Sequence, residues 1–107
     1  MTPQPDEDRR KHQRILLPED HLLVCKGLDP KFEGRVSVIG SGGLFVRTRQ
    51  ALTMGQIIRV RIEDPALTLE IQCTVRDVNE KGAGVEFHAL AHPHQRILQQ
   101  FLRTLRP

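Results

Sequence analysis

Residues 34–47 read GRVSVIGSGGLFVR, in which two runs of β-favouring residues flank a cluster of glycines. The valine, isoleucine, leucine and phenylalanine residues of these runs favour extended backbone. Gly40, Gly42 and Gly43 are expected to supply the positive φ angles that other residues resist. The pattern therefore predicts a β-hairpin whose turn lies at Gly40–Gly43. Such a turn is either a plain reversal of the chain or a place where a ligand meets backbone N–H groups directly.

Other short strands are predicted on both sides of this hairpin. Residues 22–26 form a first predicted strand, while residues 57–62 and 67–76 alternate apolar with polar side chains as half-buried strands do. The inward positions of these two segments and of a last strand at 82–87 are expected at Ile58, Val60, Ile62, Leu67, Leu69, Ile71, Cys73, Val75, Ala83, Val85 and Phe87. Five or six short antiparallel strands without a helix between them predict a mainly β fold, a closed or nearly closed barrel.

The apolar spacing changes after Pro93 from every second residue to every third or fourth. This change predicts an amphipathic helix at residues 93–106. Its apolar side is expected to carry Ile97, Leu98, Phe101, Leu102 and Leu105. We expect this side to cover the open end of the barrel; the alternative is that part of it docks a partner.

The length of 107 residues fits one domain. Residues 1–14 contain two prolines and almost no apolar side chains, so they are expected to form a flexible basic arm ahead of a domain at 15–107. No apolar run approaches the ~20 residues of a membrane span, and the first residues lack the features of a signal peptide. These observations predict a cytoplasmic protein, in which Cys25 and Cys73 are small buried hydrophobic residues rather than a disulfide.

The net charge of +3 favours an anionic partner. Arginine supplies 12 of the 16 basic residues, and its planar guanidinium group suits phosphate groups and guanine edges. Tryptophan and tyrosine are absent, and the four phenylalanines are expected mostly at core positions. Single-stranded nucleic acid usually stacks on exposed aromatic side chains, so this composition argues against a nucleic-acid-binding barrel while the arginines argue for it.

The hairpin sequence resembles the second signature of the PilZ family, a small β-barrel domain that binds the bacterial messenger cyclic di-GMP. The family pattern there is an acidic or amide residue, any residue, a serine, two further residues and a glycine, often continuing as Gly-Gly-Leu-Phe-Val. With Gly42 and Gly43 as the glycine pair, Val38 stands at the acidic position and Gly40 at the serine. In the family these two side chains hydrogen-bond a guanine, which valine and glycine cannot do.

The Arg10-x-x-x-Arg14 spacing resembles the first PilZ signature, and it precedes the glycine turn by roughly the expected interval. The resemblance covers about nine-tenths of the chain, including the Gly-x-Gly-Val-x-Phe strand at Gly82–Phe87. It implies a small antiparallel six-stranded β-barrel with an N-terminal arm and a C-terminal helix. In PilZ-like proteins an arginine directly before the pair, here Arg9, accompanies binding of two stacked cyclic di-GMP molecules.

The resemblance implies a non-catalytic receptor that binds cyclic di-GMP through Arg9, Arg10, Arg14 and the backbone of Ser41, Gly42 and Gly43. The arm would fold over the ligand and create a surface that a partner protein reads. The alternative is a degenerate PilZ-like domain that has lost the nucleotide and serves as a protein-interaction module.

No catalytic signature supports an enzyme, because Gly40-Ser41-Gly42 lacks the spacing of a nucleophile elbow. The histidines at 88, 92 and 94 match no standard metal site even with a cysteine added, so we expect helix-capping or solvated histidines and no metal cofactor.

Overall fold

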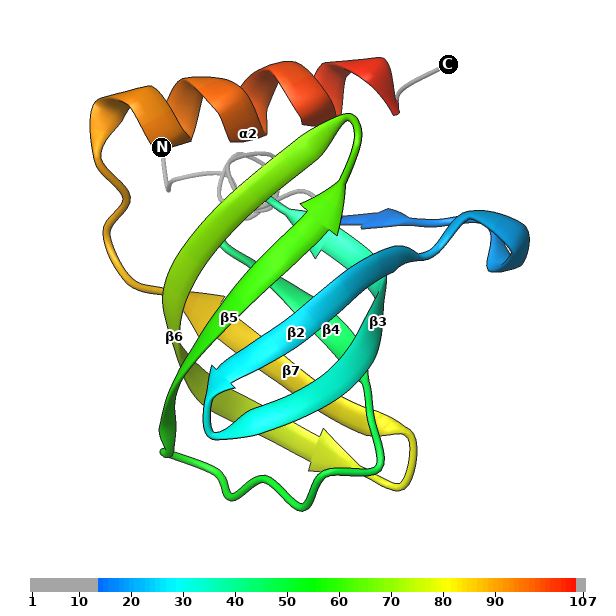
Figure 1. Cartoon of the computed structure of the whole chain (residues 1–107), viewed down its shortest axis with the longest axis vertical. Coiled ribbons are helices and arrows are strands. Elements are labelled where there is room, and N and C mark those ends of the chain that lie inside the picture. The colour runs from blue at the N-terminus through cyan, green and yellow to red at the C-terminus, as the bar shows by residue number, and fades with distance from the viewer. Residues whose placement is uncertain (1–13, 106–107) are drawn as a thin grey trace, which may run out of the picture.

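The computed structural model describes residues 14–105, and Arg9, Arg10 and the rest of the predicted arm before Arg14 lie outside the described residues. Figure 1 shows a β-barrel with one helix across its upper end. The elements are β1 (Arg14–Leu16), the 3-10 helix η1 (Glu19–His21), β2 (Leu23–Asp29), β3 (Lys31–Gly40), β4 (Gly43–Arg47), β5 (Ile57–Asp64), β6 (Leu67–Asn79), β7 (Gly82–Phe87) and α2 (His92–Thr104). Arg14, expected at the end of the arm, is the first residue of β1.

Six antiparallel strands close into the predicted barrel. The strand order is β1-β3-β2-β5-β6-β7-β4, and a further pairing of β3 with β4 completes the circle. Because β3 is long, its second half also pairs with the short β1, which lies outside the six-stranded ring. The register shifts once in β3, between Val36 and Val38, and once in β6, between Val75 and Asp77. Such bulges bend a strand and redirect a side chain.

The alternating apolar residues fill the barrel as the sequence predicts. Ile58, Val60, Ile62, Leu67, Leu69, Ile71, Cys73, Val75, Ala83 and Val85 are all buried in one core. The thiols of Cys25 and Cys73 are free and lie in that core. Phe87 differs from its prediction, because it is only partly buried at the end of β7.

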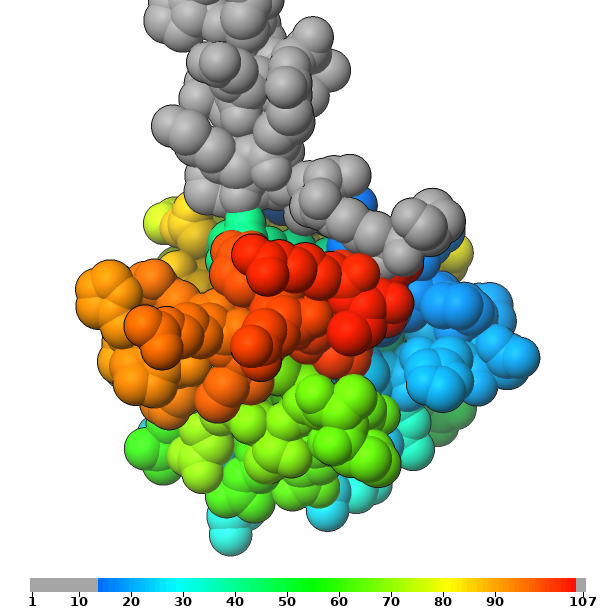
Figure 2. All heavy atoms as spheres, turned by 90° about the horizontal axis from the view of Figure 1, so that it is seen from above, coloured from blue at the N-terminus to red at the C-terminus, as the bar shows by residue number. Residues whose placement is uncertain are grey.

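Helix α2 covers the upper end of the barrel, which confirms the expected role of its apolar side. Figure 2 shows it lying across this end beside the tip of the β5–β6 hairpin. Leu98, Phe101 and Leu102 are buried, and the partly buried Leu105 packs against the core. Ile97 was expected on the same side but is 40% exposed, since it lies at the edge of the apolar stripe. No helix in the described part of the chain is long and apolar enough to cross a membrane.

The glycine cluster forms the predicted hairpin between β3 and β4, but its backbone differs from the prediction. Among the described residues only Gly55 has a positive φ, so the expected positive φ angles at Gly40, Gly42 and Gly43 are wrong. Position 43 instead requires glycine because it has no room for a side chain: a Cβ there would lie 2.2 Å from the carbonyl oxygen of Val85 on β7. The reversal takes place at Ser41 and Gly42, at the end of the barrel that α2 covers.

Candidate functional site

Two cavities meet at the glycine turn, and both are lined by Gly42 and Phe87. The first, which we call the outer cavity, lies on the outer surface of β4, β7 and β6 and has a volume of about 310 Å³. The second, which we call the end cavity, lies between the turn and α2 and has a volume of about 270 Å³. A ligand that contacts Gly42 would therefore lie beside the barrel wall and beside the helix.

The outer cavity combines charged, aromatic and backbone groups. Its lining comprises Arg14, Gly42, Gly43, Phe45, Arg76, Asp77, Gly84, Val85, Glu86 and Phe87. Arg14 reaches it because β1 pairs with β3 in the register that sets Arg14 opposite Gly40. Arg76 lies at the register shift in β6, and its Nε and Nη2 groups donate to Glu86 Oε1 at 3.0 and 2.9 Å.

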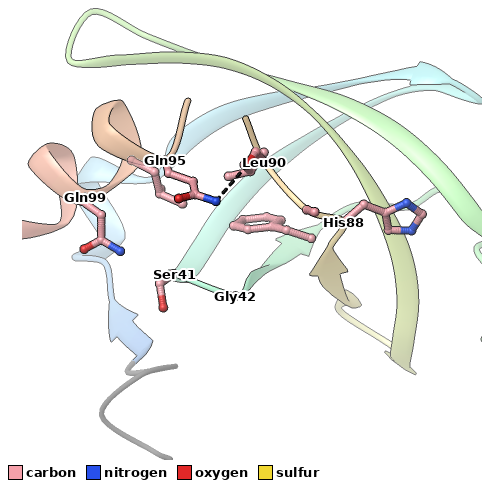
Figure 3. Close-up of a pocket in the computed structure, with 9 residues that line it drawn as sticks. Ser41, Gly42, His88, Leu90, Gln95 and Gln99 are labelled. Carbon is pink, nitrogen blue, oxygen red and sulfur yellow. Dashed lines mark hydrogen bonds between the residues drawn. The ribbon is translucent and has the colours of Figure 1, made fainter. Parts of the chain in front are cut away.

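The end cavity is lined by the turn, the segment after β7 and the first half of α2. Figure 3 shows Ser41 and Gly42 on one side and Gln95 and Gln99 of α2 on another. The Nε2 group of Gln95 donates to the Leu90 carbonyl oxygen at 2.8 Å, which ties the helix to the preceding segment. Thr74 Oγ1 and His88 Nε2 share a hydrogen bond of 2.7 Å at its edge.

The structure brings together three of the predicted site residues, Arg14, Gly42 and Gly43, in the outer cavity. Ser41 lies on the other side of the turn and lines the end cavity. Val38 is half-buried, and Gly40 is buried opposite Arg14. Arg9 and Arg10 fall outside the residues that the structure describes.

Sequence reasoning missed Phe45, Arg76 and Glu86. Phe45 is one of the four phenylalanines that were expected mostly at core positions, but it is only partly buried and lines the outer cavity, while its neighbours Leu44 and Val46 point into the barrel. Strict alternation along Leu44–Val46 was the signal that would have placed it outside. Arg76 and Glu86 carried no such signal, because their contact depends on the register between β6 and β7.

Among residues 14–105, the thiols and the histidines form no reactive or metal-binding cluster. Burial raises the pKa of Cys25 to about 12, and burial together with the charge of the Cys25 thiolate raises the pKa of Cys73 to about 12. Within residues 14–105 no group of three or more His, Cys, Asp or Glu residues is arranged to hold a metal ion. At the glycine turn, the outer cavity combines charged side chains with accessible space.

Solved structures with this fold come from several bacteria. The PilZ domain of YcgR from Escherichia coli, solved with c-di-GMP, aligns with a TM-score of 0.77 and 16% identity over 91% of each chain. The Bacillus subtilis inhibitor of motility MotI/DgrA aligns with a TM-score of 0.66 and 20% identity over 95% of this chain and 55% of its own. PlzA of Borreliella burgdorferi, solved with c-di-GMP, gives 0.60 and 13% over 90% of this chain and 42% of its own.

The present chain therefore spans 91% of the YcgR domain but only about half of the longer MotI/DgrA and PlzA proteins. No curated protein sequence matches it closely enough to be called a relative. At the level of sequence, the model of the PilZ domain matches residues 8–104, which is most of the chain. The barrel, the helix across its end and this match agree, and the chain belongs to the PilZ domain family.

Proposed function

We propose that this chain is a non-catalytic bacterial receptor for cyclic di-GMP, which acts in the cytoplasm and signals by contact with a partner protein. The observation that carries the proposal is that Arg14, Gly42 and Gly43 line one cavity. Arg14 belongs to the first predicted motif, whereas the two glycines belong to the second. The guanidinium of Arg14 suits phosphate or a guanine edge, and the turn offers backbone close to the ligand. The two neighbours solved with c-di-GMP share the fold.

In this proposal Arg9, Arg10 and Arg14 bind the phosphates and guanines from the N-terminal side, while Ser41, Gly42 and Gly43 meet the ligand from the barrel. The bound ligand and the residues before β1 then form a new surface beside the glycine turn. Because the end cavity joins this turn to α2, that surface is continuous with the exposed side of the helix. A partner protein that recognises the surface would respond only to the bound state.

A specific observation favours one alternative, an interaction module that has lost the nucleotide. Val38 and Gly40 carry no side-chain hydrogen-bonding group, and the loss of two such bonds costs roughly 1–3 kcal/mol, about one to two decades of affinity. Contacts from the arginines and the turn remain available, so this loss weakens binding without abolishing it. Retained, weakened binding is what separates the proposed function from the alternative.

Calorimetric titration with cyclic di-GMP tests the proposal. We expect the parent protein to bind, and we expect Arg14→Ala to lower the affinity about tenfold or more while the melting temperature stays nearly the same, because Arg14 is exposed. Arg59→Ala is the matched control, since Arg59 is an exposed strand arginine that does not line the outer cavity. A parent protein that does not bind would contradict the proposed function and support the interaction module. Equal binding by Arg14→Ala and the parent would contradict the role of Arg14.

A further inference from the structure

The inference rests on the proposed function and concerns how the base of the ligand is recognised. Valine and glycine at positions 38 and 40 offer no side-chain donor or acceptor, so specificity for a guanine needs polar groups elsewhere. The strand register indicates where these lie. Val38 is paired with Leu16 on one side and Phe45 on the other, Phe45 is paired with Gly84, and Gly84 with Asp77. This row crosses five strands on the outer surface and leads from an apolar strip into the outer cavity.

Phe45 supplies an aromatic ring in this cavity. Directly opposed residues of antiparallel strands point to the same face, so Phe45 lies beside the position where Gly84 has no side chain. A Cβ built on Gly84 would meet Phe45 Cδ2 at 3.8 Å and Asp77 Cβ at 3.5 Å. The missing side chain thus leaves a recess between the ring and Asp77. A flat base can enter such a recess and stack on the ring.

Arg76 supplies the polar recognition group. Its bonds to Glu86 Oε1 use Nε and Nη2, and they leave the other edge of the guanidinium, formed by Nη1 and the second N–H of Nη2, facing away from Glu86. The side chain is 62% exposed, so this edge is accessible to a ligand in the cavity. Two parallel N–H groups can donate to O6 and N7 of guanine. Adenine cannot accept both bonds, because it carries a donor amino group where guanine has O6.

The charges and the size of the cavity favour a base over a phosphate. Arg14 and Arg76 share the lining with Asp77 and Glu86, so the formal charges of the lining balance. A phosphate would meet both carboxylates, whereas guanine offers donors and acceptors together. A volume of about 310 Å³ is at the lower end for ligand pockets, about 300–1,000 Å³, and suits part of a dinucleotide rather than the whole molecule.

We infer that the outer cavity is a guanine-recognition site, in which Phe45 stacks on the base and Arg76 reads its O6 and N7 atoms. Glu86 is a positioning residue that fixes the plane of the Arg76 guanidinium. Guanine recognition in this chain thus uses β4, β6 and β7 in place of side chains at positions 38 and 40.

The test compares cyclic di-GMP with cyclic di-AMP by calorimetry on the full chain. Arg76→Gln is expected to lower the affinity for cyclic di-GMP about tenfold or more and to leave the affinity for cyclic di-AMP almost unchanged, because only guanine accepts both bonds. Arg61→Gln is the matched control, since Arg61 makes a similar cross-strand ion pair with Glu70 away from the cavity. Both pairs are exposed, so neither change is expected to prevent folding.

Two further changes separate stacking and positioning from a general structural effect. In Gly84→Ala the added methyl group occupies the recess and makes only ordinary van der Waals contacts, so the protein is expected to fold. We expect this variant to bind cyclic di-GMP about tenfold more weakly. Glu86→Ala should reduce the preference for guanine over adenine, and Glu86→Gln should restore part of it because the amide oxygen still accepts from Arg76.

The outcomes distinguish this inference from the proposed function. A parent protein that binds neither dinucleotide overturns both. A parent protein that binds cyclic di-GMP, together with Arg76→Gln and Gly84→Ala variants that bind it equally well, overturns the guanine site and leaves the proposed function in place. An equal loss for cyclic di-GMP and cyclic di-AMP in Arg76→Gln shows that Arg76 acts on phosphate, and this also overturns the inference.

Discussion

Gly43 and Gly84 lie on neighbouring strands, and they differ in what a methyl group would meet. A Cβ at Gly43 would lie 2.2 Å from a backbone oxygen, whereas the nearest heavy atom to a Cβ at Gly84 is a side-chain carbon at 3.5 Å. We therefore expect Gly43→Ala to lower the free energy of unfolding by about 1–3 kcal/mol or more, because β4 and β7 must separate. Gly84→Ala should change it little. Urea denaturation of both variants measures the difference, and equal stabilities would contradict the close approach at Gly43.

The two buried thiols predict a specific dependence of stability on pH. Both pKa values are raised to about 12 in the folded state, above the ordinary value of about 8.5, because burial disfavours the thiolate. At about pH 7.5 and lower, well below the ordinary thiol pKa, both states hold the protons and the thiols have no effect on the pH dependence. Between about pH 9 and pH 12 only the unfolded state releases them, so stability falls by about 1.4 kcal/mol per pH unit for each thiol.

Chemical denaturation between pH 8 and pH 10.5 measures this slope. The Cys25→Ala and Cys73→Ala changes each leave a cavity and lower stability at every pH. The informative quantity is therefore the slope, which should become shallower in each single variant and shallowest in the double variant. A slope that is the same in all four proteins would show that other groups cause the alkaline loss of stability.

At the level of elements, α2 divides into positions that cover the barrel and positions that do not. Leu98 is 2% exposed and Phe101 6%, whereas the adjacent Ile97 is 40% exposed. Leu98→Ala and Phe101→Ala are expected to cost about 2–5 kcal/mol of unfolding free energy, and Ile97→Ala less than about 1 kcal/mol. Equilibrium unfolding in urea gives these values. Similar losses at Leu98 and Ile97 would mean that the helix is rotated about its axis relative to the present arrangement.

The strands and the helix could be predicted from the sequence because their burial follows a simple period. Ile58, Val60 and Ile62 alternate strictly, and all three are buried in the barrel. The bulges in β3 and β6 could not be predicted in this way, because a bulge depends on the partner strand and not on local alternation. For the same reason the short β1 was missed: its pairing uses the part of β3 that extends beyond β2.

The candidate site likewise contains residues that could be predicted from the sequence and residues that could not. The glycine turn and Arg14 could be predicted because short motifs carry them, and the structure brings them to one cavity. Arg76 and Glu86 are 10 positions apart on different strands, and only the register across the turn of the β6–β7 hairpin makes them neighbours. Sequence motifs therefore located one wall of the cavity, and the topology of the barrel supplied the other.

At the scale of the whole molecule, the net charge and the arginines make association with an anion dependent on salt. The chain carries a net charge of +3, and the proposed ligand, cyclic di-GMP, carries two phosphates. Ionic attraction between exposed groups is screened over about 10 Å at 0.1 M salt. We expect the affinity for cyclic di-GMP to fall steadily between about 0.05 and 0.5 M salt. Calorimetry at several salt concentrations measures this trend, and a constant affinity would indicate that stacking and neutral hydrogen bonds dominate binding.

We predict that the number of cyclic di-GMP molecules bound by one chain depends on Arg9, which directly precedes the Arg10-x-x-x-Arg14 pair. Two stacked cyclic di-GMP molecules bring four phosphates together, and their mutual repulsion must be offset by nearby cations. A third guanidinium provides this charge and can also stack on an exposed guanine. We therefore predict two ligands per chain, of which the second requires Arg9.

Calorimetry at protein concentrations well above the dissociation constant measures the binding ratio directly. The ratio is expected to be near two in the parent protein and to fall toward one in Arg9→Ala, because the first ligand retains Arg10, Arg14 and the glycine turn. Lys11→Ala removes one positive charge two positions further along and serves as the control, so its ratio should stay near two. If the control also falls to one, total charge and not the position of Arg9 governs the second ligand. A ratio of one in the parent protein would contradict the predicted stacking of two molecules.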